Sequence, residues 1–167
     1  MAHVETSERQ AASWAITGAR HGGITVSEMD RSLAYYQDLL GLELVWRGDL
    51  PAAVIGKIVD VPEATGFEVA FLRIPGSETQ VELVEYKGIE KVSGASSPDR
   101  HGTGHFCVFV ESIDALYDDL AAKGVRFRSD GPVEMTTGPN KGGKSLYSLD
   151  PDGYVFEFHE RPPHVAA

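Results

Sequence analysis

The chain of 167 residues contains an internal duplication, and this feature limits its fold more than any other. Residues 21–41 resemble residues 105–124: each stretch starts with His, runs as a short apolar strand, and continues as an amphipathic helix before a Gly. Residues 71–85 resemble residues 146–160, because both place a Pro/Gly turn before an alternating strand. Each half therefore predicts a strand, a helix, and further strands joined by a hairpin turn.

The duplication sets the expected domain organisation. A chain of this length forms one domain, or two small modules that share a core. Residues 51–66 have no counterpart in the second half, so they form an insert with a short helix. The expected boundaries are a tail at 1–15, a first module at 16–90, a Gly/Ser/Pro-rich linker at 91–104, a second module at 105–161 and a tail at 162–167.

The composition argues against several classes of partner. The net charge is −10 and the pI is about 5.0, which disfavours nucleic acid or an anionic membrane surface. No apolar run approaches the roughly 20 residues that span a bilayer, and the N-terminal residues lack the pattern of a signal peptide. The single cysteine, Cys107, excludes an internal disulfide and a cysteine-based zinc site. We therefore expect a cytoplasmic protein that acts on a small molecule.

Strand alternation places one His and one Glu of each half on the strand face away from the helix. They are His21 and Glu82 in the first half, and His105 and Glu157 in the second. A lone His or Glu in a strand is most often a solvated residue, but both types recur at matching positions. A pseudo-two-fold axis between the halves would gather two imidazoles and two carboxylates, a set that suits divalent Zn, Ni, Co, Mn or Fe.

The same alternation selects side chains that could line a substrate site around the metal. Gln80, Thr25, Phe109 and Tyr147 are expected to face it. His159 has the same orientation, but it lies near the end of its strand, which is compatible with a supporting role or with exposure.

A Gly-rich loop at residues 136–144 carries two lysines, Lys141 and Lys144, just before the strand that leads to Glu157. A surface loop with two lysines is most often only solvated. The functional interpretation is a mobile lid whose cations bind an anionic part of the substrate.

Local rules predict the roles of a few neighbouring residues. Arg20 precedes His21, and alternation predicts that it points away from the metal site. Ser27 is the expected N-cap of the first long helix, and Ser112 or Glu111 that of the second.

Four stretches of the sequence together resemble the vicinal oxygen chelate superfamily, which includes glyoxalase I, methylmalonyl-CoA epimerase, extradiol dioxygenases and bleomycin resistance proteins. They are HGGITVSEMDRSLAYYQDLLGLELV, TQVELVEY, GHFCVFVESIDALYDDLAAKGV and LYSLDPDGYVFEF. The resemblance implies an α+β fold of two tandem βαβββ modules that form a cupped, mixed β-sheet around a metal. It also implies that His21, Glu82, His105 and Glu157 are the metal ligands, with water or substrate oxygens completing an octahedron.

The resemblance leaves three classes of function open. The additional carboxylate of Glu82 resembles the branch of glyoxalase I and the epimerases, whose metal-dependent lyases and isomerases move a proton next to a carbonyl. Glu157 and Glu82 are then the candidate catalytic residues, with Glu157 as the expected base. The alternatives are an Fe(II)-dependent extradiol-type dioxygenase and a drug-binding resistance protein. A homodimer acting on a small molecule with adjacent oxygens is expected, and the sequence leaves open whether modules pair within one chain or between two.

Overall fold

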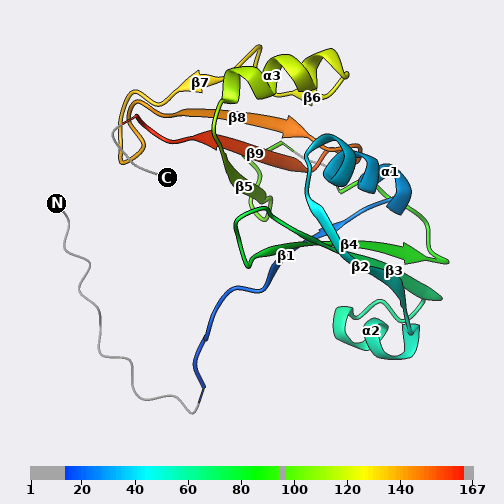
Figure 1. Ribbon diagram of the computed structural model, residues 1–167. Coiled ribbons are helices and arrows are strands. Elements are labelled where there is room, and N and C mark those ends of the chain that lie inside the picture. Colours follow the sequence, from blue (N-terminus) through cyan, green and yellow to red (C-terminus); the bar gives the residue numbers. More distant parts are fainter. Residues whose placement is uncertain (1–13, 95–96, 164–167) are drawn as a thin grey trace.

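The computed structural model describes residues 14–94 and 97–163, which fold into two modules of similar design (Figure 1). The first module contains β1 (His21–Thr25), α1 (Met29–Leu33), its π-helical continuation η1 (Ala34–Leu39), β2 (Glu43–Leu50), α2 (Ala52–Val59), β3 (Gly66–Arg73) and β4 (Gln80–Lys87). The second contains β5 (His105–Val110), α3 (Ile113–Ala122), β6 (Arg126–Phe127), β7 (Val133–Glu134), β8 (Lys144–Leu149) and β9 (Val155–Glu160). Within the described ranges, no helix has the length and apolarity needed to cross a bilayer.

Each module forms its own mixed sheet. The first sheet has the strand order β1-β4-β3-β2, and the second has the order β5-β9-β8-β6, with β7 also paired to β8. In both sheets the strand that begins the module runs parallel to the last strand, while the remaining pairs are antiparallel. The predicted α+β class and the two βαβββ-type modules are therefore confirmed. Both β1 and β5 lie at an edge of their sheet.

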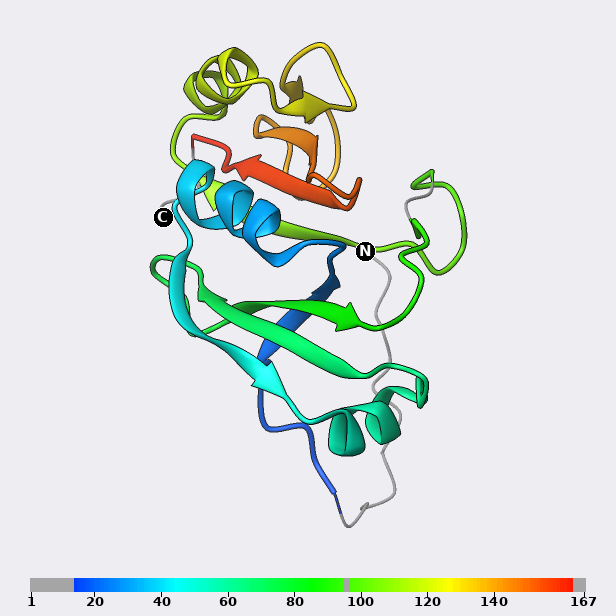
Figure 2. The ribbon, with the colours of Figure 1, turned by 90° about the vertical axis from the view of Figure 1, so that its right-hand side faces the viewer.

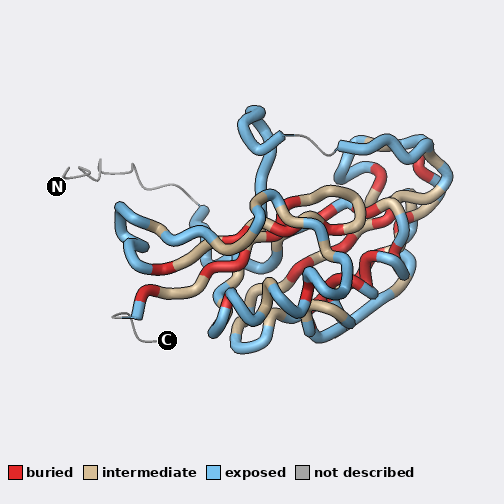
Figure 3. The backbone as a smooth tube through the Cα atoms, turned by 90° about the horizontal axis from the view of Figure 1, so that it is seen from above, coloured by how far each residue is buried: buried red, intermediate tan, exposed pale blue. Residues whose placement is uncertain are grey.

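One apolar core joins the two modules. It includes Ile24 and Leu83 from the first sheet and Phe156 and Phe158 from the second, all nearly or fully buried. Helix α1 lies between the two sheets (Figure 2), and the buried segments follow the strands of both (Figure 3). At Gly22 a Cβ atom would come within 2.6 Å of the Phe106 ring, so only glycine lets β1 pack this closely on β5.

Two adjacent tyrosines of η1 reach across to the second sheet. The Tyr35 and Ser148 hydroxyls are hydrogen-bonded at 2.7 Å, and the Tyr36 hydroxyl donates to Asp150 at 2.9 Å. Burial raises the pKa of Tyr35 to about 12, so this hydroxyl stays neutral in the core. The Tyr36 ring packs edge-on against Phe156 at 5.6 Å between centroids. Both tyrosines therefore contribute apolar area to the core and keep a partner for their polar ends.

Near the end of its last strand, each module carries a glutamate that holds the start of that module's helix. The Met29 N–H donates to Glu85 at 2.8 Å, and the Ile113 N–H donates to Glu160 at 2.8 Å. A carboxylate at a helix N-terminus satisfies a free N–H group and is favoured by the helix dipole. This repeated contact fixes the helix against the same strand that carries Glu82 or Glu157.

The expected helix caps are half correct. Ser112 caps α3, accepting the Ala115 N–H at 3.4 Å. The prediction for Ser27 is wrong, because its hydroxyl donates instead to Asp152 in the β8–β9 turn at 2.6 Å. Arg31 also pairs with Asp152, at 2.5 Å, so a contact between modules replaces the local cap.

The insert of the first module packs on the face of the first sheet that is opposite to the shared core. Phe67, Val69 and Ala64 form a second buried cluster there, and Ile55 of α2 packs against it. By the strand register, Val69 and Phe67 lie on the same face as Glu82. Helix α2 therefore covers one end of the face that carries the predicted metal ligands.

We expect Glu85 to stabilise the fold in a pH-dependent manner. Burial raises the pKa of Glu85, but hydrogen bonds from Lys91, Lys87 and the Met29 N–H outweigh burial and lower the pKa to about 2, from an ordinary value of 4.5. A carboxyl with a lowered pKa stabilises the folded state above its unfolded pKa, and this stability is lost as the pH falls towards the folded pKa.

Glu85→Gln should therefore lower the free energy of unfolding by about 2 kcal/mol near pH 7, and the loss should shrink towards about pH 3. Urea unfolding of both proteins across this range measures the difference. Glu78→Gln removes the same charge from an exposed turn and should change stability little. An equal loss for Glu85→Gln at both pH values would contradict the assignment.

Candidate metal centre

In the first module His21 and Glu82 face each other across adjacent strands. His21 begins β1, Glu82 lies on β4, and the His21 Nε2 is 3.2 Å from the Glu82 Oε2. The Phe71 ring lies 5.6 Å from the His21 ring, and Trp46 packs beside Phe71 at 6.2 Å between centroids. The surroundings of this pair are thus mostly aromatic.

The second module repeats the arrangement with more polar neighbours. The His105 Nε2 lies 3.0 Å from the Glu157 Oε2, and the Ser145 hydroxyl donates to the Glu157 Oε1 at 2.7 Å. The Tyr147 ring lies 5.2 Å from the His105 ring. Burial and the Glu157 carboxylate raise the pKa of Tyr147.

We call the sheet face that carries each His–Glu pair the ligand face. In both sheets it is opposite to the face that the shared core buries, because Glu82 alternates with Val81 and Leu83, and Glu157 with Phe156 and Phe158. The structure brings together two pairs and not all four residues. Among the described residues, no three His, Cys, Asp or Glu side chains gather closely enough to hold a metal ion.

The residues expected to line a substrate site all lie on the ligand faces. Gln80 pairs in register with His21, and Thr25 is exposed at the other end of β1. Tyr147 flanks His105 as described, and Phe109 is 58% exposed on β5. The Arg161 guanidinium lies 3.4 Å from the centre of the Phe109 ring, a cation–π contact at the same face.

The two loop lysines occupy different places. Lys144 is paired in register with Glu160, on the helix side of the second sheet, and its ammonium group binds Asp114 on α3. It therefore lies on the face away from Glu157. Lys141 is exposed in the turn before β8.

Three side chains show features that the sequence interpretation did not capture. The Arg20 guanidinium lies 5.4 Å from the centre of the Phe71 ring, so Arg20 reaches the ligand-face aromatics and does not point away from them. His159 is only 5% exposed, and its Nε2 has no hydrogen-bond partner in the part of the chain that is described. Ser145 was not among the predicted site residues. It lies two residues before Tyr147 on the same strand, so strand alternation would have placed it on the same face, near Glu157.

Cys107 lies beside Glu157 but is not suited to act as a nucleophile. It is the Cα partner of Glu157 in the β5–β9 register. Burial and the adjacent Glu157 carboxylate raise the pKa of its thiol to about 12, so the reactive thiolate is scarce at neutral pH.

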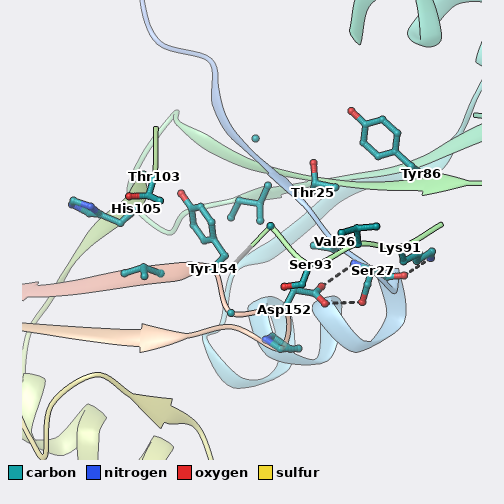
Figure 4. Close-up of a pocket in the computed structure, with 18 of the residues that line it drawn as sticks. Thr25, Val26, Ser27, Tyr86, Lys91, Ser93, Thr103, His105, Asp152 and Tyr154 are labelled. Carbon is teal, nitrogen blue, oxygen red and sulfur yellow. Dashed lines mark hydrogen bonds between the residues drawn. The ribbon is translucent and has the colours of Figure 1, made fainter. Parts of the chain in front are cut away.

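A cavity of about 770 Å³ extends from His105 to the first module (Figure 4). Three tyrosines, Tyr86, Tyr147 and Tyr154, contribute to its wall, together with Thr25. Its volume is typical of a site for a small molecule. The cavity therefore provides space for an organic ligand next to the second His–Glu pair.

A family model for the Glyoxalase/Bleomycin resistance protein/Dioxygenase superfamily matches residues 18–158, a range that contains both His–Glu pairs. The chain belongs to this superfamily. Among solved structures, a glyoxalase family protein from Bacillus cereus has a TM-score of 0.76 at 17% identity, covering 92% of this chain and 99% of that chain. This likeness shows the fold alone.

Curated relatives within the superfamily include several lactoylglutathione lyases. The enzyme of Haemophilus influenzae is 32% identical over 146 residues, which cover 84% of this chain and 90% of the relative. The enzyme of Arabidopsis thaliana is 32% identical over 141 residues, but the match spans only 42% of that longer protein. A 2-epi-5-epi-valiolone epimerase from Actinomyces is 28% identical over 145 residues, covering 85% of this chain and 78% of the relative.

If both pairs bind metal, His21→Ala and His105→Ala should each lower the bound divalent metal about tenfold or more, because each removes a ligand that no neighbour replaces. Elemental analysis of protein purified without chelators measures the metal content. His101→Ala, in the exposed linker, is the matched control and should leave the metal content unchanged. A full complement of metal in the His21→Ala, His105→Ala double variant would refute the assignment.

Proposed function

We propose that the chain is a metal-dependent lyase or isomerase of the glyoxalase type, which moves a proton next to a carbonyl group. The observation that carries this proposal is the repeated His–Glu pair, one in each module, with the His Nε2 and Glu Oε2 atoms 3.2 and 3.0 Å apart. The similarity to lactoylglutathione lyases and to an epimerase supports the same class of reaction.

The donor atoms fit a divalent cation, with Zn, Ni, Co, Mn and Fe as the candidates. In each pair an imidazole nitrogen and a carboxylate oxygen already point at each other, so both can turn to a common ion with little movement. His21 and Glu82 would provide half of the ligands, and His105 and Glu157 the other half. When bound, the cation would act as a Lewis acid on substrate oxygens and make the adjacent C–H group more acidic.

We propose that two copies of the chain build each complete site. Within one chain the shared core is buried between the modules, and the two ligand faces carry separate pairs. Both histidines lie on sheet-edge strands, β1 and β5. Among the described residues each of these strands has one hydrogen-bonded neighbour, so the other edge is suited to pairing with another chain. A symmetric homodimer would join β1 of each copy to β5 of the other and complete two equivalent sites.

Glu157 is the proposed base. Its side chain is 14% exposed, against 21% for Glu82, and it lies beside the cavity wall formed by His105 and Tyr147. The Glu157 carboxylate would accept the proton from the substrate carbon and return it to the neighbouring atom. A carboxylate that remains bound to a cation is a weak base, so Glu157 would act as the base only when its carboxylate is not held by the cation.

The proposed substrate is a small molecule with adjacent oxygens, such as the hemithioacetal of a thiol and a 2-oxoaldehyde. The lactoylglutathione lyases to which the chain is similar favour a glutathione adduct as the first compound to test. Lys141 is the better candidate of the two lysines for binding an anionic group, because Lys144 is already paired with Asp114. The free thiol of Cys107 fits the reducing cytoplasm as the place of action.

Glu157→Gln should keep most of the bound metal and lower the rate about 10²–10⁴-fold, the usual contribution of a general base. The amide oxygen can still bind a cation, but it cannot carry a proton at a useful rate. Wild-type protein should place solvent deuterium on the carbon next to the carbonyl, and Glu157→Gln should place almost none. Glu82→Gln is the matched variant and should lose less activity.

A screen of hemithioacetals, acyl-CoA esters and catechols by NMR in deuterated water, with an oxygen electrode in parallel, decides between the functions. Oxygen consumption with a catechol, without deuterium exchange into any carbonyl compound, would replace the lyase with the dioxygenase. Tight binding of an aromatic drug without turnover of any compound would instead favour the resistance protein.

A further inference from the structure

The two glutamates of the predicted site are held differently. Both oxygens of Glu157 have a partner, since Oε1 accepts the Ser145 hydroxyl at 2.7 Å and Oε2 lies 3.0 Å from the His105 Nε2. For Glu82 the described contact is to Oε2, from His21 at 3.2 Å. The modules are duplicates in fold, so this difference arises from the residues on the two neighbouring strands, where Cys107 of β5 is the Cα partner of Glu157 and Gly23 of β1 that of Glu82.

The register of β3 with β4, and of β8 with β9, identifies the residue that holds Oε1. Phe71 is the Cα partner of Glu82, and Tyr147 is the Cα partner of Glu157. Two positions before each partner, on the same ligand face, the first module has Val69 and the second has Ser145. The hydroxyl beside the second glutamate therefore has an apolar counterpart in the first module.

Ser145 lies near the start of β8, directly after a hydrogen-bonded turn. The turn before β8 is closed by two backbone hydrogen bonds between Met135 and residues 142 and 143, each of 2.8 Å. A Cβ atom on Gly143 would lie 2.5 Å from the Glu160 carbonyl oxygen, so this backbone packs directly on the end of β9. Lys144 is fixed on the other face by Asp114. The Ser145 hydroxyl is thus presented to Glu157 from the start of a strand that packs on the end of β9.

We propose that Ser145 is a positioning residue for Glu157, and this inference rests on the proposed role of Glu157 as the base. By holding Oε1, Ser145 would leave Oε2 directed at the substrate when Glu157 leaves the metal. A hydroxyl can both donate and accept, so Ser145 can stay paired whether the carboxyl group is charged or protonated. The proton is taken up and returned by Glu157 alone, and Ser145 gains and loses none.

The first test separates positioning from binding. Ser145→Ala should lower kcat about 10–100-fold, the scale of a misplaced reacting group, while KM and metal content change little. Ser145→Thr keeps the hydroxyl and should restore most of kcat. Ser129→Ala is the matched control, because it removes a serine hydroxyl whose described hydrogen bond is to the Gly131 carbonyl in a loop of the same module, and kcat should not change.

The second test asks whether Ser145 acts through Glu157. Added to Glu157→Gln, Ser145→Ala should cause no further loss of rate, whereas added to Glu82→Gln it should cause its full loss. An unchanged kcat in Ser145→Ala, or an equal loss in both backgrounds, would overturn the inference.

A third measurement does not depend on activity. In metal-free protein, the NMR signal of the Glu157 side-chain carboxyl carbon should shift in Ser145→Ala and return in Ser145→Thr. If wild-type protein moves no proton on any substrate but this signal shifts, the proposed function fails and the hydrogen bond remains. If the wild type is active and the signal does not move, the inference about Ser145 fails alone.

Discussion

A single apolar core between the two modules determines where a polar site can lie. Ile24 and Leu83 of the first sheet, and Phe156 and Phe158 of the second, are buried together with α1 between the sheets. Strand alternation then leaves each His–Glu pair on the opposite face of its sheet. One folded unit therefore carries two separate His–Glu pairs, and the proposed dimer follows from this arrangement.

Duplication and divergence explain the rest of the site. Glu85 and Glu160, near the ends of β4 and β9, hold the two helices in the same way, so the fold of the modules has stayed equivalent. The two ligand faces, in contrast, have diverged. The first is aromatic around Phe71 and partly covered by α2, whereas the second carries Ser145. A pair of equivalent carboxylates in different surroundings is the usual basis for giving one of them the role of base.

The sequence predicted the features that depend on the internal repeat and on strand alternation. Its predictions were wrong where long-range contacts determine the position of a side chain. The pairing of His21 with Glu82 and of His105 with Glu157 is a consequence of two adjacent strands with a period of two. The partner of Ser27 could not be predicted from the sequence, because its hydroxyl binds Asp152 of the other module and does not cap the nearby helix. Arg20 directly precedes β1, and its long side chain reaches the Phe71 ring, so alternation predicted the wrong direction.

Mixing of two inactive variants tests most directly whether each site is shared between two chains. His21→Ala and His105→Ala homodimers should each be inactive, since every site lacks one ligand. After dissociation and reassociation of an equal mixture, half of the dimers should be mixed and carry one intact site, restoring about a quarter of the wild-type activity. Recovery on this scale is expected if each site is shared between two chains. No recovery from a mixture that forms mixed dimers would show that both histidines act within one chain, and would contradict the shared site.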